Sequence, residues 1–173
     1  AFCMLNDQAI AANFLLENNY VKKILIIDLD VHQGDGTASI FSNNDNVFTL
    51  SFHGKNNYPF KKEKSDLDIA LDDFTNDRYY LKKLNEILPK VLDEFQPEFI
   101  FYLSGVDVLE SDQLGKISLS IEACKERDKI VLGAAKENKI PIQISMGGGY
   151  SKKIKDIVEA HSNTFRLAQE IFF

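Results

Sequence analysis

The chain has 173 residues, a hydrophobic share of 45% and a formal net charge of −6 at pH 7. This length and composition suit a single α/β domain, and neither requires a second one. The negative charge disfavours direct nucleic-acid binding, which needs clustered basic side chains to neutralise phosphates, but it is compatible with a cationic partner.

Strands and helices are expected to alternate along the chain. In order, we expect a helix at 9–20, strands at 24–28 and 47–52, a helix from 77 to 92, a strand at 99–103, a helix at 121–135, a strand at 141–145 and a final helix from 151 to 173. The expected helix caps are Asn76, Ser118 or Ser120, and Ser151. Strands separated by helices of this length predict right-handed crossovers and a parallel sheet.

The first apolar strand runs into a cluster of acidic and histidine residues. Asp28, Asp30 and His32 alternate along an extended segment, so their side chains lean the same way and come within reach of one point. Carboxylate oxygens and an imidazole nitrogen suit a catalytic zinc or another divalent ion. The competing interpretation is structural, because acidic residues at a strand end sometimes only cap the next helix or turn a loop.

Two later strands end in residues that favour the chemical interpretation. The strand at 99–103 is followed by Asp107, and the strand at 141–145 is followed by three glycines and Tyr150. In open α/β sheets ligands bind beyond the carboxyl ends of the strands, so these loops are expected to converge. The glycine run lacks the Lys-Ser or Lys-Thr pair of a phosphate-binding loop.

Three segments resemble the zinc-dependent histone deacetylase family, which includes acetoin-utilisation and acetylpolyamine hydrolase relatives. They are Asp-Leu-Asp-Val-His-Gln-Gly-Asp-Gly at 28–36, Ser-Gly-Val-Asp-Val-Leu-Glu-Ser-Asp-Gln-Leu-Gly at 104–115 and Gly-Gly-Gly-Tyr at 147–150. The start of the chain resembles the family's Gly-Phe-Cys segment, and small prokaryotic or class IV members look closest. The resemblance implies a three-layer α/β/α fold of the arginase/deacetylase type, with 1–173 as the central and C-terminal portion of one domain.

The resemblance implies hydrolysis of an acyl amide, with acetyl-lysine or an acetylated small amine as substrate. Asp30, His32 and Asp107 match the ligands of zinc, for which Fe²⁺ or another divalent ion is the alternative. Tyr150 matches the tyrosine that stabilises the oxyanion. Asp28 and Asp35 match the carboxylates that orient two tandem histidines.

The resemblance also implies a substrate tunnel and an inner site for a monovalent cation. Phe2 and Tyr58 match the aromatic walls of the tunnel, with Phe60 as a less favoured candidate for the second wall, and the substrate-binding residues also include Gly148 and Gly149. Oxygen atoms around Asp28, Asp30, His32, Ser51 and Phe52 match the inner site, which usually holds potassium.

One departure from the family pattern concerns the catalytic base. In the family the tandem histidines lie about nine residues before the phenylalanine matched by Phe2, and this chain begins at Ala1. Its histidines are His32, His53 and His161, none adjacent to another. We expect His53 to be structural and His161 to lie on the surface. The chain would then be a fragment of a larger protein, with apolar surface left exposed at an edge or face of its sheet.

Three alternatives to an active deacetylase remain. A truncated, catalytically incompetent module would bind metal or partners without turnover. A haloacid-dehalogenase-like phosphatase would use Asp28 and Asp30 as its nucleophile and acid. A generic metal-binding α/β protein would explain the ligands but not the order of the motifs.

The expected location is the cytoplasm. Two cysteines, Cys3 and Cys124, are too few for a disulfide framework, so thiols in a reducing compartment are expected. The chain has no apolar run long enough to span a bilayer and no recognisable leader.

Overall fold

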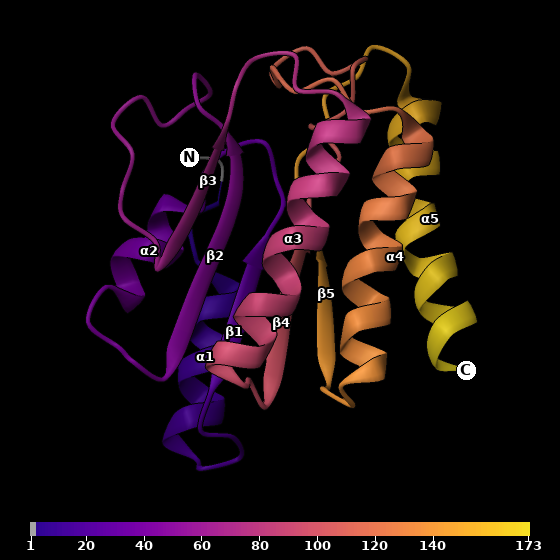
Figure 1. Cartoon of the computed structure of the whole chain (residues 1–173). Helices are drawn as coiled ribbons and strands as arrows, with labels where there is room; N and C mark the ends of the chain where they lie inside the picture. The colour runs from indigo at the N-terminus through magenta and orange to yellow at the C-terminus, as the bar shows by residue number, and fades with distance from the viewer. Residues whose placement is uncertain (1–2) are drawn as a thin grey trace.

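The computed structural model describes residues 3–173, which form a parallel sheet flanked by helices (Figure 1). The elements are α1 (Asp7–Glu17), β1 (Ile24–Asp28), α2 (Asp35–Phe41), β2 (Val47–Gly54), β3 (Leu67–Leu71), α3 (Asp77–Phe95), β4 (Phe99–Ser104), α4 (Ile121–Glu137), β5 (Ile142–Met146) and α5 (Ile154–Phe172). The strand order is β3-β2-β1-β4-β5, and all neighbouring strands are parallel. Every residue of the central strand β1 is buried, which accounts for the apolar run at 24–27 that precedes Asp28.

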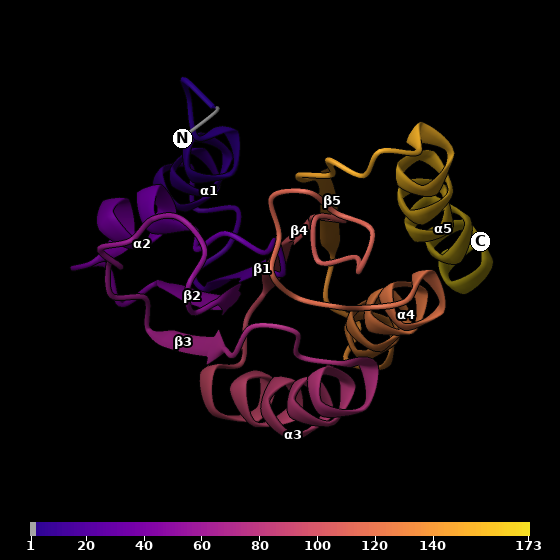
Figure 2. The same ribbon diagram turned by 90° about the horizontal axis from the view of Figure 1, so that it is seen from above.

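Helices cover both faces of the sheet, as the view from above shows (Figure 2). Leu25 and Ile27 of β1 belong to a core shared with α3, α4 and α5. Ile24 and Ile26 point the other way and pack in a smaller core with α1 and α2. Alternation along one strand therefore fills two cores, and the three-layer α/β/α fold expected from the sequence is confirmed.

Two of the expected helix caps are present and one is wrong. The Asn76 side chain accepts the backbone N–H of Tyr79 at the start of α3, and Ser120, not Ser118, caps α4. Ser151 does not cap α5, which begins three residues later at Ile154. The Ser151 hydroxyl lies 2.8 Å from the Ser111 hydroxyl and is used in that loop contact instead.

The sequence-based expectations miss two short elements and misplace one histidine. Helix α2 and strand β3 were not expected, since each is short and mixes polar with apolar residues. His161 was expected on the surface, yet it is 7% exposed. That expectation is wrong because α5 turns the face carrying Ala160, His161 and Thr164 toward α4.

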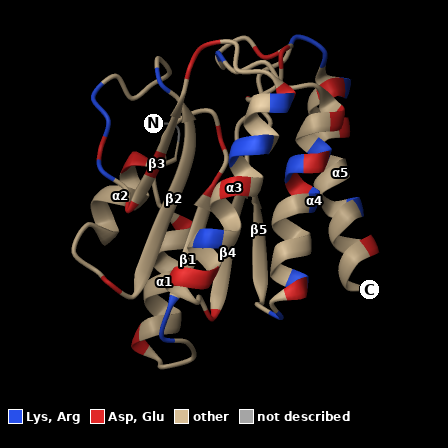
Figure 3. Ribbon diagram, in the orientation of Figure 1, with Lys and Arg blue, Asp and Glu red and all other residues tan. Residues whose placement is uncertain are grey.

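In the described part of the chain, basic side chains are not gathered on a single helix or loop. Lys and Arg are spread over α3, α4, α5 and the loop between β2 and β3 (Figure 3). Among the helices of residues 3–173, none combines the length and apolarity that a bilayer crossing requires.

Cys3 is an exposed free thiol, and Cys124 is a buried one in the core between α4 and the sheet.

Candidate metal centre and active site

A cavity of about 820 Å³ opens at the carboxyl ends of the strands. The residues that the sequence singled out and that line this cavity are Asp28, Asp30, His32, Asp35, Tyr58, Phe60, Asp107, Gly148 and Tyr150. They lie at the end of β1 and in the segments that follow β1, β2, β4 and β5. The parallel sheet thus brings side chains more than 100 residues apart in the sequence to one place.

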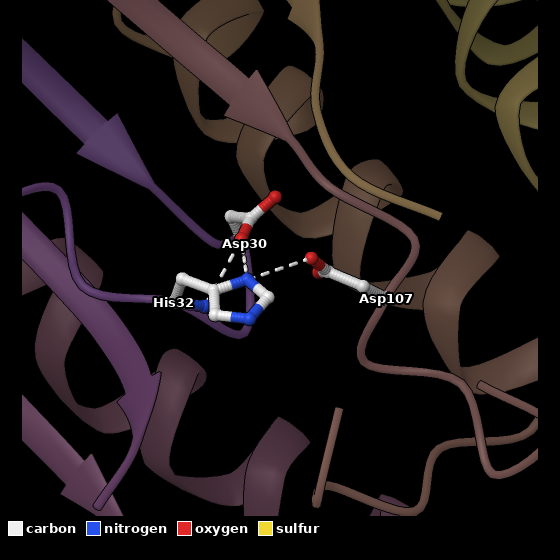
Figure 4. A group of neighbouring side chains, drawn as sticks. All are labelled: Asp30, His32 and Asp107. Carbon is white, nitrogen blue, oxygen red and sulfur yellow. Dashed lines mark hydrogen bonds and ion pairs between the residues drawn. The ribbon is translucent and has the colours of Figure 1, made fainter. Parts of the chain in front are cut away.

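Asp30, His32 and Asp107 lie closest together (Figure 4). One ligand atom from each lies within 4.8 Å of the others. The His32 Nδ1 atom is 3.0 Å from Asp30 Oδ1 and 3.1 Å from Asp107 Oδ2. Two carboxylates and an imidazole are a donor set that zinc and other divalent ions accept, and three protein ligands are the number used by catalytic zinc sites. The residues present therefore fit a divalent cation.

Backbone N–H groups hold the two carboxylates in place. The N–H of Gly148 donates to Asp30 Oδ2 at 2.8 Å, and the N–H of Val31 donates to Asp107 Oδ1 at 2.9 Å. Asp28 is bound in the same way, since its Oδ1 accepts the N–H of Asp30 at 3.0 Å. These hydrogen bonds join the loops that carry the candidate ligands to one another. The positions of the carboxylates therefore do not depend on one flexible side chain.

The cluster has a strongly negative electrostatic character. Burial and the neighbouring Asp30 raise the pKa of Asp107 to about 7. Burial, with Asp30 next in importance, also raises the pKa of Asp28 above its usual range. Hydrogen bonds to Asp107 and Asp30 raise the pKa of His32 to about 10. An environment that favours the protonated form of His32 this strongly also favours positive charge at this place. A divalent cation would supply that charge.

Glycine at position 148 is required by close approach. A Cβ atom there would overlap Asp107 Oδ2 and lie 3.1 Å from Asp30 Oδ2. Gly149 was expected at the substrate site, but it is not among the described residues that line the cavity. A Cβ on Gly149 would instead meet Val106 and Ile157, in the packing between the β4 loop and α5.

Tyr150 lines the cavity beside the three candidate ligands. Its backbone N–H donates to Asp112 Oδ2 at 2.6 Å. Burial, followed by the charges of Asp107 and Asp30, raises the pKa of Tyr150, so its hydroxyl stays protonated at neutral pH. A protonated phenol at this place is a hydrogen-bond donor toward any group in the cavity.

The sequence-based site did not include Asp112. Its Oδ1 accepts the N–H groups of Leu114 and Gly115, which makes a side-chain-supported turn, and its Oδ2 holds Tyr150. An aspartate followed by glycine three residues later is a turn signal that was available. That signal does not say that the turn supports a tyrosine from a different loop.

The aromatic residues expected in the tunnel are placed in part. Tyr58 and Phe60 line the cavity, and their rings meet edge to face with centroids 6.3 Å apart. Both rings are exposed, so they form a rim. Phe2 lies outside the described residues. Asp35 also lines the cavity and opens α2, where its Oδ1 accepts the N–H of Gly36.

The residues expected around an inner monovalent cation lie on two adjacent strands and the loop that follows. Ser51 of β2 stands opposite Asp28 of β1, and Phe52 follows Ser51. The Ser51 hydroxyl is 3.1 Å from His53 Nδ1. His53 is buried, as expected for a structural histidine, and it does not line the cavity formed by the described residues.

Comparison with known proteins identifies the family. The model of the histone deacetylase domain matches residues 1–165. An uncharacterized protein of Picosynechococcus is 40% identical over 171 residues, covering 99% of this chain and 57% of that protein. Histone deacetylase 2 of Arabidopsis thaliana is 31% identical over 91% of this chain and 41% of its own length. A probable deacetylase of Archaeoglobus fulgidus is 32% identical over 87% of this chain and 45% of its own length.

Solved structures show the same fold. The acetylpolyamine aminohydrolase from Burkholderia pseudomallei superposes with a TM-score of 0.83 at 21% identity, covering 99% of this chain and 51% of that one. The histone deacetylase Clr3 gives a TM-score of 0.81 at 22% identity, covering 97% of this chain and 30% of that one.

The chain belongs to the histone deacetylase family, and its fold is the deacetylase fold. It spans about half of the length of the curated relatives it matches. Membership of this family argues against the phosphatase alternative. It also explains the order of the motifs, which a generic metal-binding protein would not explain.

Proposed function

We propose that this chain forms the metal-binding part of an amidohydrolase that removes an acetyl group from acetyl-lysine or a related acetylated amine. The observation that carries the proposal is the convergence of Asp30, His32 and Asp107 in a cavity that Tyr150 also lines. The names of the relatives, histone deacetylase and probable deacetylase, support acetylated amines as the substrate class.

Zinc is the proposed ion, with Fe²⁺ or another divalent ion as the alternative. Asp30, His32 and Asp107 would hold it. A bound divalent ion would supply Lewis-acid polarisation of the substrate carbonyl and of a water molecule. The grouping of three buried carboxylates, Asp28, Asp30 and Asp107, around a single imidazole supports this assignment.

The chain's own groups would bind and stabilise the reacting amide. The Tyr150 hydroxyl would donate a hydrogen bond to the oxyanion that develops as the carbonyl is attacked. Gly148 lets its loop approach the two carboxylates closely, and Gly149 lets the same loop pack against Val106 and Ile157. Tyr58 would form an aromatic wall at the rim around the acyl-lysine chain, with Phe60 beside it.

Proton transfer is assigned to groups beyond these residues. Asp28 and Asp35 would orient two tandem histidines, and the three histidines of this chain include no adjacent pair. Among these three, only His32 lines the cavity that the described residues form. This observation favours the second candidate, in which the isolated chain binds metal or a partner without turnover.

Further proposals concern the inner cation, the partners and the location. Potassium is proposed at the inner site formed by Asp28, Asp30, His32, Ser51 and Phe52. The scattered basic residues support the absence of direct nucleic-acid binding (Figure 3). The two free thiols support a cytoplasmic location.

Hydroxamate binding tests the proposed function. The zinc-loaded chain should bind a zinc-directed hydroxamate, measured by calorimetry, and should not bind the phosphate mimic vanadate at the same site. Asp107→Asn should abolish hydroxamate binding, whereas Asp93→Asn, at an exposed aspartate of α3, should leave it unchanged. Equal hydroxamate affinity with and without zinc, or in Asp107→Asn, would overturn the proposal.

A further inference from the structure

A fully buried arginine lies beneath the candidate metal centre. Arg127 belongs to α4, and its side chain has no exposed surface. An isolated charge in such a place would cost many kcal/mol, so its partners are the reason that it is tolerated.

The guanidinium of Arg127 reaches the backbones of both ligand-bearing loops. Its Nη1 donates to the carbonyl oxygen of Leu29 at 3.1 Å and to that of Gly105 at 2.7 Å. Leu29 is the residue before Asp30, and Gly105 is two residues before Asp107. One nitrogen therefore bridges the chain segments that carry the two carboxylate ligands.

The orientation of Arg127 is itself set by a buried acid. Its Nε and Nη2 lie 2.9 and 2.8 Å from Asp128 Oδ1. Asp128 also accepts hydrogen bonds from the hydroxyl groups of Tyr102 in β4 and Thr164 in α5. A strand and two helices thus hold the guanidinium, and the planar fork serves two carbonyls and one carboxylate at once.

The distance between the two loops affects the metal centre, because hydrogen bonds and close packing connect their side chains and backbones. The Val31 N–H binds Asp107, and the Gly148 N–H binds Asp30. A Cβ on Gly105 would overlap Asp30, so the loops pass each other at the closest approach that glycine permits. A small separation of these backbones would move Asp30 and Asp107 apart by a similar amount.

We propose that Arg127 is a positioning residue of the metal centre: by joining the carbonyls of Leu29 and Gly105 it sets the separation of the Asp30 and Asp107 carboxylates. The effect of Arg127 on metal affinity rests on the proposed function. Its effect on the separation of the two loops does not, and this effect is testable in the metal-free chain.

The test uses the 173-residue chain and the double variant Arg127→Met/Asp128→Asn. Changing both residues removes the ion pair without leaving Asp128 charged and unpaired, and asparagine still accepts from Tyr102. The control is Leu88→Ala, at a buried position in the second half of α3. That helix ends at Phe95, whose carbonyl accepts from Lys23 just before β1, at the opposite end of the sheet from the site.

Amide hydrogen exchange gives the first measurement. In the double variant, exchange at the Val31 and Gly148 amides without metal should accelerate at least about tenfold beyond the acceleration in Leu88→Ala. Zinc affinity, measured by competition with a chelating dye, should fall about ten- to a hundredfold in the double variant and stay unchanged in Leu88→Ala. If the double variant does not fold, Arg127→Lys is compared in its place, because lysine keeps the charge but cannot serve both carbonyls and Asp128.

The two proposals fail in different ways. Exchange at Val31 and Gly148 that accelerates no more in the double variant than in Leu88→Ala would overturn the positioning role, whatever the zinc affinity. Unchanged zinc affinity alongside faster exchange would also overturn it, because the loops would then move without consequence for the site. Absence of zinc binding in the unmodified chain would overturn the proposed function, while the exchange measurement would still decide whether Arg127 joins the loops.

Discussion

Gly148 shows how closely the candidate metal centre is packed. A methyl group at this position would overlap Asp107 Oδ2, and the Gly148 N–H also holds Asp30. We expect Gly148→Ala to lower zinc affinity by about tenfold or more, since displaced ligands lose their common focus. Gly133→Ala in α4 is the matched control, because a Cβ there meets nothing within 4 Å. Equal zinc affinity in the two variants, measured by dye competition, would contradict the close packing.

Tyr150→Phe should separate catalysis from binding. In a form of the protein that turns over acetyl-lysine, removing the hydroxyl should lower kcat by roughly a hundredfold or more, with little change in KM. The reason is that the hydrogen bond to the oxyanion strengthens as the transition state forms. Steady-state kinetics with an acetyl-lysine peptide would measure both constants. A loss confined to KM would remove the role given to the hydroxyl.

Residues with a motif were predictable from the sequence, and residues without one were not. Asp30, His32, Asp107 and Tyr150 follow apolar strands, so the rule that parallel strands end at one edge places them together. Arg127 was not predictable, because an arginine in an amphipathic helix normally indicates a solvent-exposed face. Only the tertiary structure shows that this position faces the loops.

Helix α3 begins where the sequence predicts, and the contribution of its N-terminal cap to stability can be measured. The Asn76 side chain accepts the N–H of Tyr79, so Asn76→Ala should lower the free energy of unfolding by about 1 kcal/mol. Lys153→Ala at the start of α5 is the control, because Lys153 makes no side-chain cap and its loss should cost almost nothing. Urea denaturation of both variants would measure the difference. Equal losses would mean that the cap of α3 contributes nothing of its own.

Helix α5 carries a pH-dependent contribution to stability. Burial lowers the pKa of His161, Arg127 lowers it further, and Asp128 and Asp30 oppose the shift. The unfolded chain then takes up a proton at about pH 6.5, before the folded chain does. The contribution of neutral His161 is therefore present above about pH 6.5 and is lost as the pH falls toward the folded-state pKa.

His161→Gln should consequently flatten the decline of stability on acidification. The slope of the unfolding free energy between about pH 6.5 and pH 5 should decrease by at most about 1.4 kcal/mol per pH unit, the value for one proton. Urea titrations at several pH values would measure it. His53, whose pKa burial also lowers, remains in both proteins, so the comparison isolates His161. Identical slopes would show that His161 takes up its proton equally in both states.

Long, periodic elements were predictable, while short ones were decided by their surroundings. The expected helix from 77 to 92 matches α3, because Asn76 and the turn before Pro97 mark both ends. Strand β3 reads Leu-Asp-Ile-Ala-Leu and lies at the edge of the sheet, where a pattern need not be apolar. Its pairing with β2 arises only when the sheet assembles, so no local signal indicates it.

Exposed apolar side chains bear on the behaviour of the whole molecule. Ile10, Phe14 and Tyr20 on and after α1 are each more than half exposed. Ile10 and Phe14 are four residues apart, so they share one helix face. The 173-residue chain should therefore associate as its concentration rises, and Ile10→Glu/Phe14→Glu should reduce this. Sedimentation velocity would measure association, with Phe74→Glu, at another exposed aromatic, as the control. A monomer at all concentrations would contradict the expectation.

Metal stoichiometry tests the central assignment of the molecule most directly. The purified chain, dialysed against zinc and then against metal-free buffer, should retain one zinc ion per chain by elemental analysis. Asp30→Ala and His32→Ala should each lose it, because each removes a ligand that the fold brings within 4.8 Å of the others. Asp93→Ala, at an exposed aspartate of α3, should keep it. Stoichiometric zinc that survives both Asp30→Ala and His32→Ala would contradict the proposed metal centre.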